Sequence, residues 1–338
     1  MRISFAANHA EIGGGEVMLL AMAQAAIESG HSAEVVAPAG EVAAQAQARG
    51  HRTVIIGGTE PLGYLRGLRA WARSERPQLL WCTGLRAAVA TAGIPRRVVH
   101  LHSLPSPLLR AALPAVTRGA LRVMVPSEWL RERLHRTRLT VLPNWTRDLS
   151  YTPHLPTAAP GDLRIGFLGR LTEDKGILVL LDALERLSDT RVGRFRLVVG
   201  GVARFGGEAD SARIAGRLAN SADQLGWVDP GTFFNSVDLA VVPSVTAESF
   251  GLVAAEAMAA GCPFVISTAG ALPEVTAHPA AFTARPGDPD DLARAITAAV
   301  TGYTVDDLHE SRRRWEELYS PDSGRARWVQ IMKSLEAG

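Results

Sequence analysis

The chain has 338 residues, of which 47% are hydrophobic and 21% are charged, and its formal net charge is only +2. This length predicts two globular domains, and the near-balanced charge gives no support for nucleic-acid binding. No apolar run is long enough to predict a spanning helix, and we expect no signal peptide. Cys82 and Cys262 stand far apart without a CxxC motif, so both are expected to be buried thiols in a reducing compartment. We therefore expect a cytoplasmic protein.

Short apolar segments alternate with helical patterns along the first part of the chain. The alternation predicts a mostly parallel sheet with crossover helices on both faces. Strands are predicted at residues 2–7, 32–40, 52–58 and 78–84, and helices at 16–30, 41–50 and 63–75.

The pattern stops at residues 151–162, where proline, alanine and small polar residues indicate an interdomain linker. The alternation then begins again and continues into charged helical segments near the end of the chain. Strands are predicted at residues 163–169, 195–201, 239–244 and 263–267, and helices at 176–187, 252–261 and 289–300.

These patterns predict two doubly wound, Rossmann-like lobes whose parallel sheets face a central cleft. We place the lobes at residues 1–152 and 160–310, and we expect the helices of residues 311–338 to pack back on the first lobe. Ligands of open α/β sheets collect at the carboxyl ends of the strands, so the cleft is the expected site.

The segment "GRLTEDKG", residues 169–176, follows a predicted strand and precedes a predicted helix. Arg170 and Lys175 would project from the carboxyl end of that strand, where their charges suit a diphosphate. Lysine occurs elsewhere only at position 333, in a chain whose other basic side chains are arginines. A solvated turn is the alternative.

The segment "ESFGLVAAE" places Glu248 before a helix that begins near Phe250 or Gly251, and Glu256 inside that helix. Gly251 would let the backbone approach a ligand, and the first-turn amides favour a phosphate or sugar hydroxyls. The two carboxylates could accept hydrogen bonds from two ends of one ligand. Spacing alone also fits an ordinary helix with acidic edges.

At this point the sequence resembles the retaining glycosyltransferases of family 4, which have the GT-B fold. The segment 243–265 is similar to their glutamate–seven–glutamate motif, and 169–176 resembles their phosphate-binding loop. Residues 11–31, 140–146 and 226–244 resemble their N-terminal glycine loop, interdomain signature and the stretch before the motif. Each motif is weak to moderate alone, whereas the ordered set covers most of the chain.

The resemblance implies a role for each matching position. Glu256 would hold the ribose hydroxyls of a nucleoside-diphosphate sugar, and Glu248 would face the transferred sugar. Arg170 and Lys175 would neutralise the diphosphate, and residues 226–228 would border the base. The implied donor-binding residues are Gly13, Gly14, Gly15, Gly169, Arg170, Lys175, Val228, Glu248, Ser249, Phe250, Gly251, Leu252 and Glu256.

His102 matches a histidine that the family often has near the reacting sugar, so the implied catalytic set is Glu248, His102, Arg170 and Lys175. The family commonly has aspartate after that histidine and asparagine–glycine at the end of the lobe. This chain instead has Ser103 and the pair Asn144–Trp145. Both departures touch the acceptor side or the hinge rather than the donor site.

Three other patterns resemble ligand sites but also have a simpler interpretation. The Asp288–Pro–Asp290 segment resembles a metal-binding motif of another glycosyltransferase fold, but a helix cap explains it. His100 and His102 could mimic a metal pair, although no third ligand is apparent, so no metal is expected. The arginines from Arg110 to Arg138 form either a solvated face or a contact for a phosphate-bearing acceptor or an anionic membrane.

Together with these residues, the resemblance implies a metal-independent, retaining hexosyltransferase with UDP as the default nucleotide and an unknown hydroxyl acceptor. The acceptor could be a glycan, a lipid carrier or a natural product, and the enzyme could associate peripherally with the inner membrane face. An epimerase or phosphorylase of the same fold, and a non-catalytic sugar-nucleotide-binding partner, remain alternatives. A dinucleotide-dependent oxidoreductase is disfavoured because its glycine fingerprint and its acid at the end of the second strand are missing.

Overall fold

The computed structural model describes residues 1–57, 61–134, 138–156, 163–188, 194–202, 208–277, 279 and 282–337. The chain divides into two compact units. Unit 1 comprises Met1–Asn144 with Gly324–Gly338, and unit 2 comprises Trp145–Ser323. Of the helices in the described parts of the chain, none has both the length and the apolar composition needed to cross a membrane.

Unit 1 contains a seven-stranded sheet in the order β3-β2-β1-β4-β5-β6-β7, and every paired strand is parallel. Its strands are β1 (Arg2–Ala6), β2 (Ser32–Ala37), β3 (Arg52–Ile55), β4 (Leu79–Thr83), β5 (Arg97–His100), β6 (Ala120–Val125) and β7 (Leu139–Val141). Its helices are α1 (Gly14–Glu28), α2 (Glu41–Ala48), α3 (Pro61–Glu75), α4 (Leu85–Ala90), α5 (Pro107–Val116), α6 (Glu128–Arg133) and most of α14 (Pro321–Glu336).

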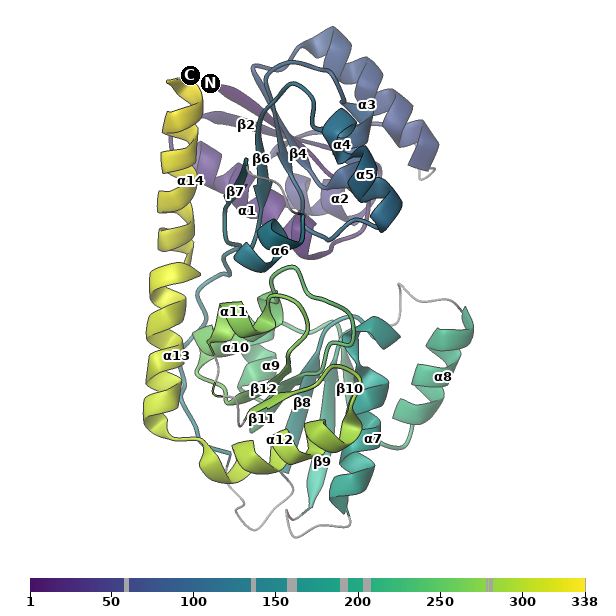
Figure 1. Ribbon diagram of the computed structural model, residues 1–338, viewed down its shortest axis with the longest axis vertical. Helices are drawn as coiled ribbons and strands as arrows, with labels where there is room; N and C mark the ends of the chain where they lie inside the picture. The colour runs from purple at the N-terminus through teal and green to yellow at the C-terminus, as the bar shows by residue number, and fades with distance from the viewer. Residues whose placement is uncertain are drawn as a thin grey trace. The chain divides into compact units, whose positions relative to one another are not determined.

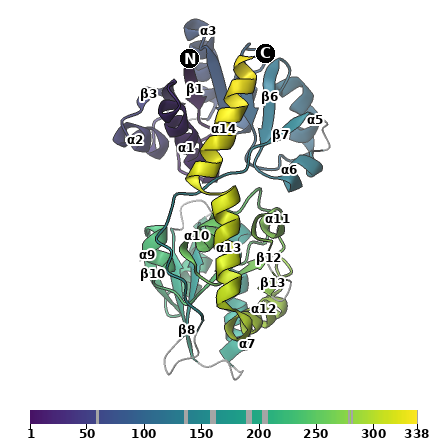
Figure 2. The same cartoon turned by 90° about the vertical axis from the view of Figure 1, so that its left-hand side faces the viewer.

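Helices cover both faces of this sheet, which explains why β4 and β5 are buried along their whole length. Helices α3, α4 and α5 lie on one side in Figure 1. Figure 2 shows α1 and α14 on the other side, and Glu28 of α1 pairs with Arg325 of α14. Trp328 of α14 is fully buried with its ring centroid 6.3 Å from that of Trp81 in β4. Residues 324–337 therefore form part of the core of unit 1.

Unit 2 contains a six-stranded parallel sheet in the order β10-β9-β8-β11-β12-β13. Its strands are β8 (Leu163–Leu168), β9 (Phe195–Gly200), β10 (Ala222–Gly226), β11 (Leu239–Val242), β12 (Phe264–Ser267) and β13 (Thr283–Ala284). Its helices are the 3₁₀ turn η1 (Glu173–Lys175), α7 (Ile177–Ser188), α8 (Glu208–Leu218), α9 (Pro230–Phe234), α10 (Leu252–Ala260), α11 (Leu272–Thr276), α12 (Pro289–Gly302) and α13 (Val305–Leu318).

The core of unit 2 joins the inward side chains of β8, β9, β11 and β12 with α7, α8 and α12. The other side is covered by α9, α10, α11 and α13, and Phe250 just before α10 meets Tyr319 just after α13 in an edge-on ring contact. The two predicted doubly wound sheets are thus confirmed. Of the predicted linker, residues 151–156 have no regular structure and 157–162 lie outside the described residues.

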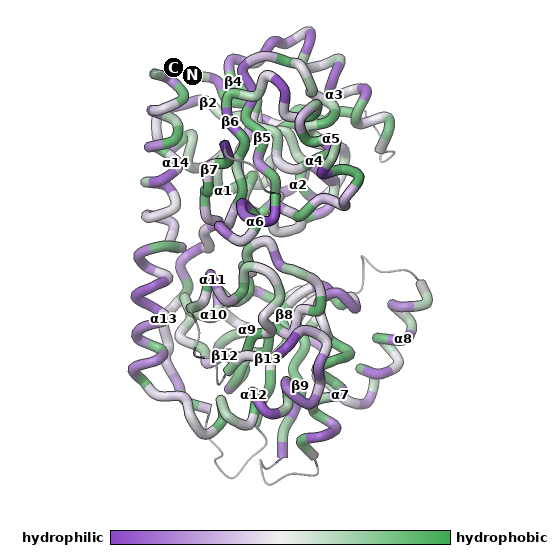
Figure 3. Tube along the Cα trace, in the orientation of Figure 1, coloured by the Kyte–Doolittle hydropathy of each residue, from purple (hydrophilic) through white to green (hydrophobic). Residues whose placement is uncertain are grey.

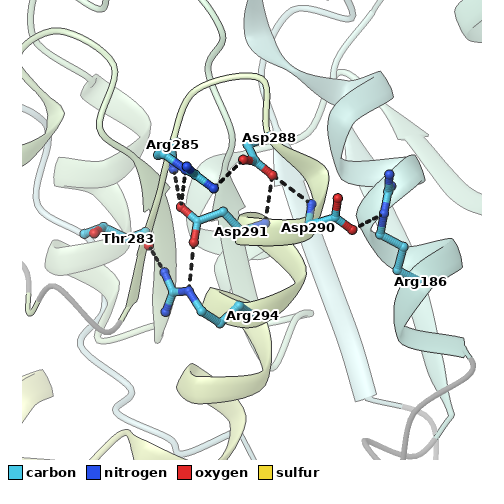
Figure 4. A network of polar contacts seen from close by, with 7 residues as sticks. All are labelled: Arg186, Thr283, Arg285, Asp288, Asp290, Asp291 and Arg294. Carbon is cyan, nitrogen blue, oxygen red and sulfur yellow. Dashed lines mark hydrogen bonds and ion pairs between the residues drawn. The ribbon is translucent and has the colours of Figure 1, made fainter.

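The Asp288–Pro–Asp290 segment forms the helix cap that its sequence predicts. Asp288 accepts hydrogen bonds from the backbone amides of Asp290 and Asp291 at 3.1 and 3.0 Å and begins α12, with a proline in the first turn. Figure 4 shows that the surrounding carboxylates are matched by Arg186, Arg285 and Arg294. Each carboxylate of this segment thus has a local structural partner, and Asp288 acts as the cap of α12.

Candidate active site

The candidate site of unit 2 lies where the order of its sheet reverses, at the carboxyl ends of the neighbouring strands β8 and β11. The loop after β8 leads through η1 into α7, and Gly176 ends η1 with φ +78°. A Cβ added at Gly176 would lie 1.9 Å from the carbonyl oxygen of Pro243, which follows β11. The loop carrying Lys175 is therefore held directly against the segment that leads to Glu248.

Lys175 and Glu248 meet at this edge. The ammonium Nζ of Lys175 donates a hydrogen bond to Oε1 of Glu248 at 2.6 Å, and the hydroxyl of Ser244 donates to the same oxygen at 2.7 Å. Both bonds fall on Oε1. Ser244 is itself fixed, because the hydroxyl of Ser267 donates to its carbonyl oxygen at 2.6 Å. The result is one oriented carboxylate beside one ammonium, both partly exposed.

The backbone of Glu248 is fixed as firmly as its side chain. Glu248 forms an isolated parallel bridge with Gly270, and its carbonyl accepts a hydrogen bond from the amide of Ala271 at 2.9 Å. A Cβ at Gly270, where φ is +67°, would lie 2.2 Å from the carbonyl oxygen of Glu248. Only glycine permits this approach, so Gly270 sets the position of Glu248.

The helix α10 begins immediately after Gly251, which has φ +102° and packs against Leu272. Phe250 is buried, whereas Gly251 and Leu252 are only partly buried. The predicted helix start is therefore confirmed to within a residue. Only Ser249, Phe250 and Gly251 separate Glu248 from the first turn of α10, whose amides can donate to an anion or to hydroxyl oxygens.

Glu256 lies one turn into α10 and has different neighbours from Glu248. Burial raises the pKa of Glu256 to about 7, while the positive charge of Arg147 opposes that rise and the negative charge of Asp229 adds to it. Arg147 forms an ion pair with Asp229, and Asp229 also caps α9 by accepting from the amide of Thr232 at 3.2 Å. Sequence reasoning missed this Arg147–Asp229 pair, although Arg147 directly follows the segment that resembles the interdomain signature.

The other predicted donor residues of unit 2 surround this edge. Arg170 pairs with Asp174 at 3.4 Å, and both side chains are exposed. Gly169 is approached so closely by Gly201 that a Cβ on Gly201 would lie 1.8 Å from the Gly169 carbonyl oxygen. Val228 follows β10 and packs against Gly200 at the end of β9. Ser249 lies between Glu248 and the buried Phe250.

Unit 1 has a glycine loop between β1 and α1, at the carboxyl edge of its own sheet. Gly14 begins α1. Glu16, in the first turn of this helix, is a second feature that sequence reasoning missed. Glu16 is 4% exposed, and the backbone amides of Glu16 itself, Gly13, Asn8 and His9 favour its charged form. Burial outweighs their effect and raises the pKa of Glu16 to about 7. The visible signal was an acid directly after three glycines at a helix start.

His102 also belongs to this edge of unit 1. A Cβ added at Gly15 would lie 3.3 Å from Cβ and Cγ of His102, so the glycine loop and this histidine are packed together. Its ring centroid lies 4.0 Å from that of His100, which ends β5, and the two rings are tilted by 44°. Burial lowers the pKa of His102 to about 3 and holds the pKa of His100 well below its usual range. Both imidazoles are therefore neutral at physiological pH.

Two further predictions concern metal ligands and the basic region from Arg110 to Arg138. Within the described ranges, no group of three or more His, Cys, Asp or Glu side chains is arranged to hold a metal ion. In the basic region, Arg131 pairs with Glu128 at 2.5 Å and the Arg133 guanidinium lies over the Trp129 ring. Arg136 lies outside the described residues.

Comparison with known proteins agrees with this arrangement. Residues 12–147 match the model of glycosyltransferase family 4, and residues 162–301 match that of the glycosyl transferases group 1. The fold is similar to that of HepE from Anabaena in complex with UDP-glucose, with a TM-score of 0.83, 21% identity, and 99% and 100% of the two chains covered.

Curated relatives match over shorter segments. The lipopolysaccharide 1,2-N-acetylglucosaminetransferase of Salmonella typhimurium is 28% identical over 198 residues, which is 52% of this chain and 50% of that protein. The phosphatidyl-myo-inositol mannosyltransferase of Mycobacterium tuberculosis is 39% identical over 137 residues, which is 39% of this chain and 35% of that protein. The chain thus spans about half the length, or less, of these relatives. Because the two family models match in order and together cover most of the chain, the chain belongs to glycosyltransferase family 4 and the glycosyl transferases group 1.

Proposed function

We propose that the protein is a retaining glycosyltransferase that moves a hexose-type sugar from a nucleoside-diphosphate sugar, with UDP as the default nucleotide, to a hydroxyl acceptor. The observation that carries the proposal is the contact between Lys175 and Glu248 at the reversal point of the sheet in unit 2. A cation for the diphosphate and a carboxylate for sugar hydroxyls are held side by side there. The UDP-glucose complex of the structurally similar HepE supports the choice of donor.

The donor has two groups of contacts in this proposal. Glu256 accepts hydrogen bonds from the ribose hydroxyls, and residues 226–228 border the base. Glu248 accepts from a hydroxyl of the transferred sugar, and the amides of Phe250, Gly251 and Leu252 donate to the sugar and phosphates. Each carboxylate thus binds a different end of the donor.

Departure of the diphosphate places negative charge on its oxygens. Lys175, Arg170 and the positive end of α10 stabilise that charge as fixed, preorganised donors. The Lys175 ammonium has three N–H bonds, so it can keep its bond to Glu248 while donating to phosphate. In the retaining mechanism, the leaving phosphate takes the proton of the acceptor hydroxyl, and we assign contacts near the reacting sugar to His102 and to the Gly13–Gly15 loop.

The decisive test is transfer by the purified protein with Lys175 replaced. We expect Lys175→Ala to lower kcat at least tenfold, an order of magnitude typical of losing one preorganised donor. Lys333→Ala is the matched control, because Lys333 is the only other lysine and is exposed on α14. Activity should persist in excess chelator.

The products separate this proposal from its alternatives. A transferase releases a nucleoside diphosphate and yields a glycosylated acceptor in equal amounts. A fully active Lys175→Ala enzyme, a strict metal requirement, or an epimerised sugar nucleotide as the only product would contradict the proposal.

A further inference from the structure

One surface of unit 1 is not explained by donor binding. Helix α5 has the sequence PLLRAALPAV, in which Arg110 is the only polar residue. A surface helix of a globular domain normally turns polar side chains to water, and a helix that is apolar on every side is normally buried. Helix α5 instead lies at the outside of unit 1, where Figure 3 shows green along much of its length.

The exposed side of α5 is apolar as well as the buried side. Leu113 and Val116 face the core, whereas Leu108 is 81% exposed and Leu109 is 42% exposed. The other exposed residues of the helix are Pro107, Ala111, Ala112, Pro114 and Ala115. None of the exposed side chains of α5 carries a polar group. The solvent-facing side of the helix is therefore an apolar surface, which is typical of an interaction site.

A neighbouring helix extends the same surface. The buried guanidinium of Arg97 donates to the carbonyl oxygen of Ala88 in α4 at 2.9 Å, and it also donates to that of Val116 at the end of α5. Through Arg97 the ends of α4 and α5 are tied together, and Val89 of α4 is 40% exposed. We call α4 and α5 with these exposed apolar side chains the α4–α5 face.

The stretch of chain that forms this face carries charge of one sign only. No aspartate or glutamate occurs between Glu75 and Glu128, while that interval contains seven arginines. Arg86 on α4 and Arg118 just after α5 are exposed, and Arg110 is partly exposed. An apolar helix surface with flanking arginines and no acids in its own stretch of chain is complementary to an anionic lipid bilayer.

We propose that the α4–α5 face docks on an anionic lipid bilayer, with Leu108 and Leu109 inserted at the boundary between headgroups and acyl chains and the arginines on the lipid phosphates. Helix α5 follows directly from the His102 edge of unit 1, so docking would bring that edge to the membrane surface. The docking is independent of donor chemistry, because neither leucine belongs to the donor or catalytic set.

The test is cosedimentation of the full chain with vesicles of phosphatidylcholine alone or mixed with phosphatidylglycerol. Binding is expected to the mixed vesicles only, and to weaken as salt is raised. Leu108→Glu/Leu109→Glu should reduce binding at least tenfold, and Arg118→Glu should reduce it less. These side chains are exposed, so the variants should fold. Ile27→Glu is the matched control, because Ile27 is 43% exposed on α1, on the opposite face of the sheet, and should bind normally.

Each contrary result would overturn the proposal. These results are absence of binding to the mixed vesicles, equal binding to phosphatidylcholine alone, and unreduced binding of Leu108→Glu/Leu109→Glu. A dimer in light scattering that the double variant dissociates would show that a second copy covers the face instead. Thermal stabilisation of every variant by UDP reports on the donor site separately, so failure of the proposed function would appear there and not in sedimentation.

Discussion

Lowering the pH from 8 to 6 should weaken UDP binding about tenfold through Glu256. Burial raises the pKa of Glu256 to about 7, and only the ionised carboxylate can accept from both ribose hydroxyls through its two oxygens. The ionised fraction falls from roughly 90% at pH 8 to roughly 10% at pH 6 for such a pKa, and the apparent Kd is the intrinsic Kd divided by that fraction. The loss is about 1.4 kcal/mol of binding free energy. Affinity must therefore rise with pH across neutrality.

Isothermal titration of UDP at fixed ionic strength measures this effect. The terminal phosphate of UDP also titrates near pH 6, so the wild type alone cannot assign the change. Glu256→Gln has no titrating side chain at this position and supplies the phosphate contribution as a background. The ratio of the two Kd values should change about tenfold between the two pH values. Parallel pH profiles for the wild type and Glu256→Gln would refute the assignment of the ribose to this carboxylate.

Two further variants test how the site is held. Gly270→Ala should lower transferase activity at least tenfold, because its methyl group would lie 2.2 Å from the Glu248 carbonyl oxygen. Gly30→Ala is the control, because Gly30 has φ +82° and no atom within 4 Å of an added Cβ, so that variant carries a similar backbone penalty without the clash. Equal activity of the two variants would contradict the role of Gly270. Urea unfolding should show Glu16→Gln gaining about 3 kcal/mol relative to the wild type between pH 4 and pH 8. The folded pKa of Glu16 is raised to about 7, so its favourable contribution is present below its unfolded pKa of about 4.5 and is lost as the pH rises through 7; a difference that does not change with pH would contradict this.

The sequence could predict the parts of the site that depend on the order of strands along the chain. Lys175 and Glu248 each follow a strand, and a doubly wound sheet places β8 and β11 side by side. Apolar runs such as those of β4 and β11 identify strands buried on both faces. By contrast, β10 has the sequence ADQLG, whose single large apolar residue gives no strand pattern. Its pairing with β9 comes from tertiary contacts rather than from local preference.

The remaining contacts depend on packing between distant segments. Arg147 and Asp229 are 82 positions apart, and no local spacing indicates that they meet beside Glu256. The sequence placed Ser244 at the end of a predicted strand. That its hydroxyl donates to the Glu248 carboxylate depends on the path of the loop between the two residues, which the structure shows. The sequence indicated only that Glu16 lies in a helix. The burial of its carboxylate among backbone amides depends on how residues 8–13 fold around it, which no local pattern shows.

The membership of residues 324–337 in unit 1 affects the order in which the chain can fold during synthesis. Unit 2 is one continuous stretch, so it can complete its sheet as soon as it leaves the ribosome. Unit 1 is translated earlier, yet Trp328, which fills its core against Trp81, is made only after all of unit 2. The first 144 residues must therefore wait with an incomplete core, and shortening the chain before Trp328 would leave that apolar surface uncovered throughout the life of the protein.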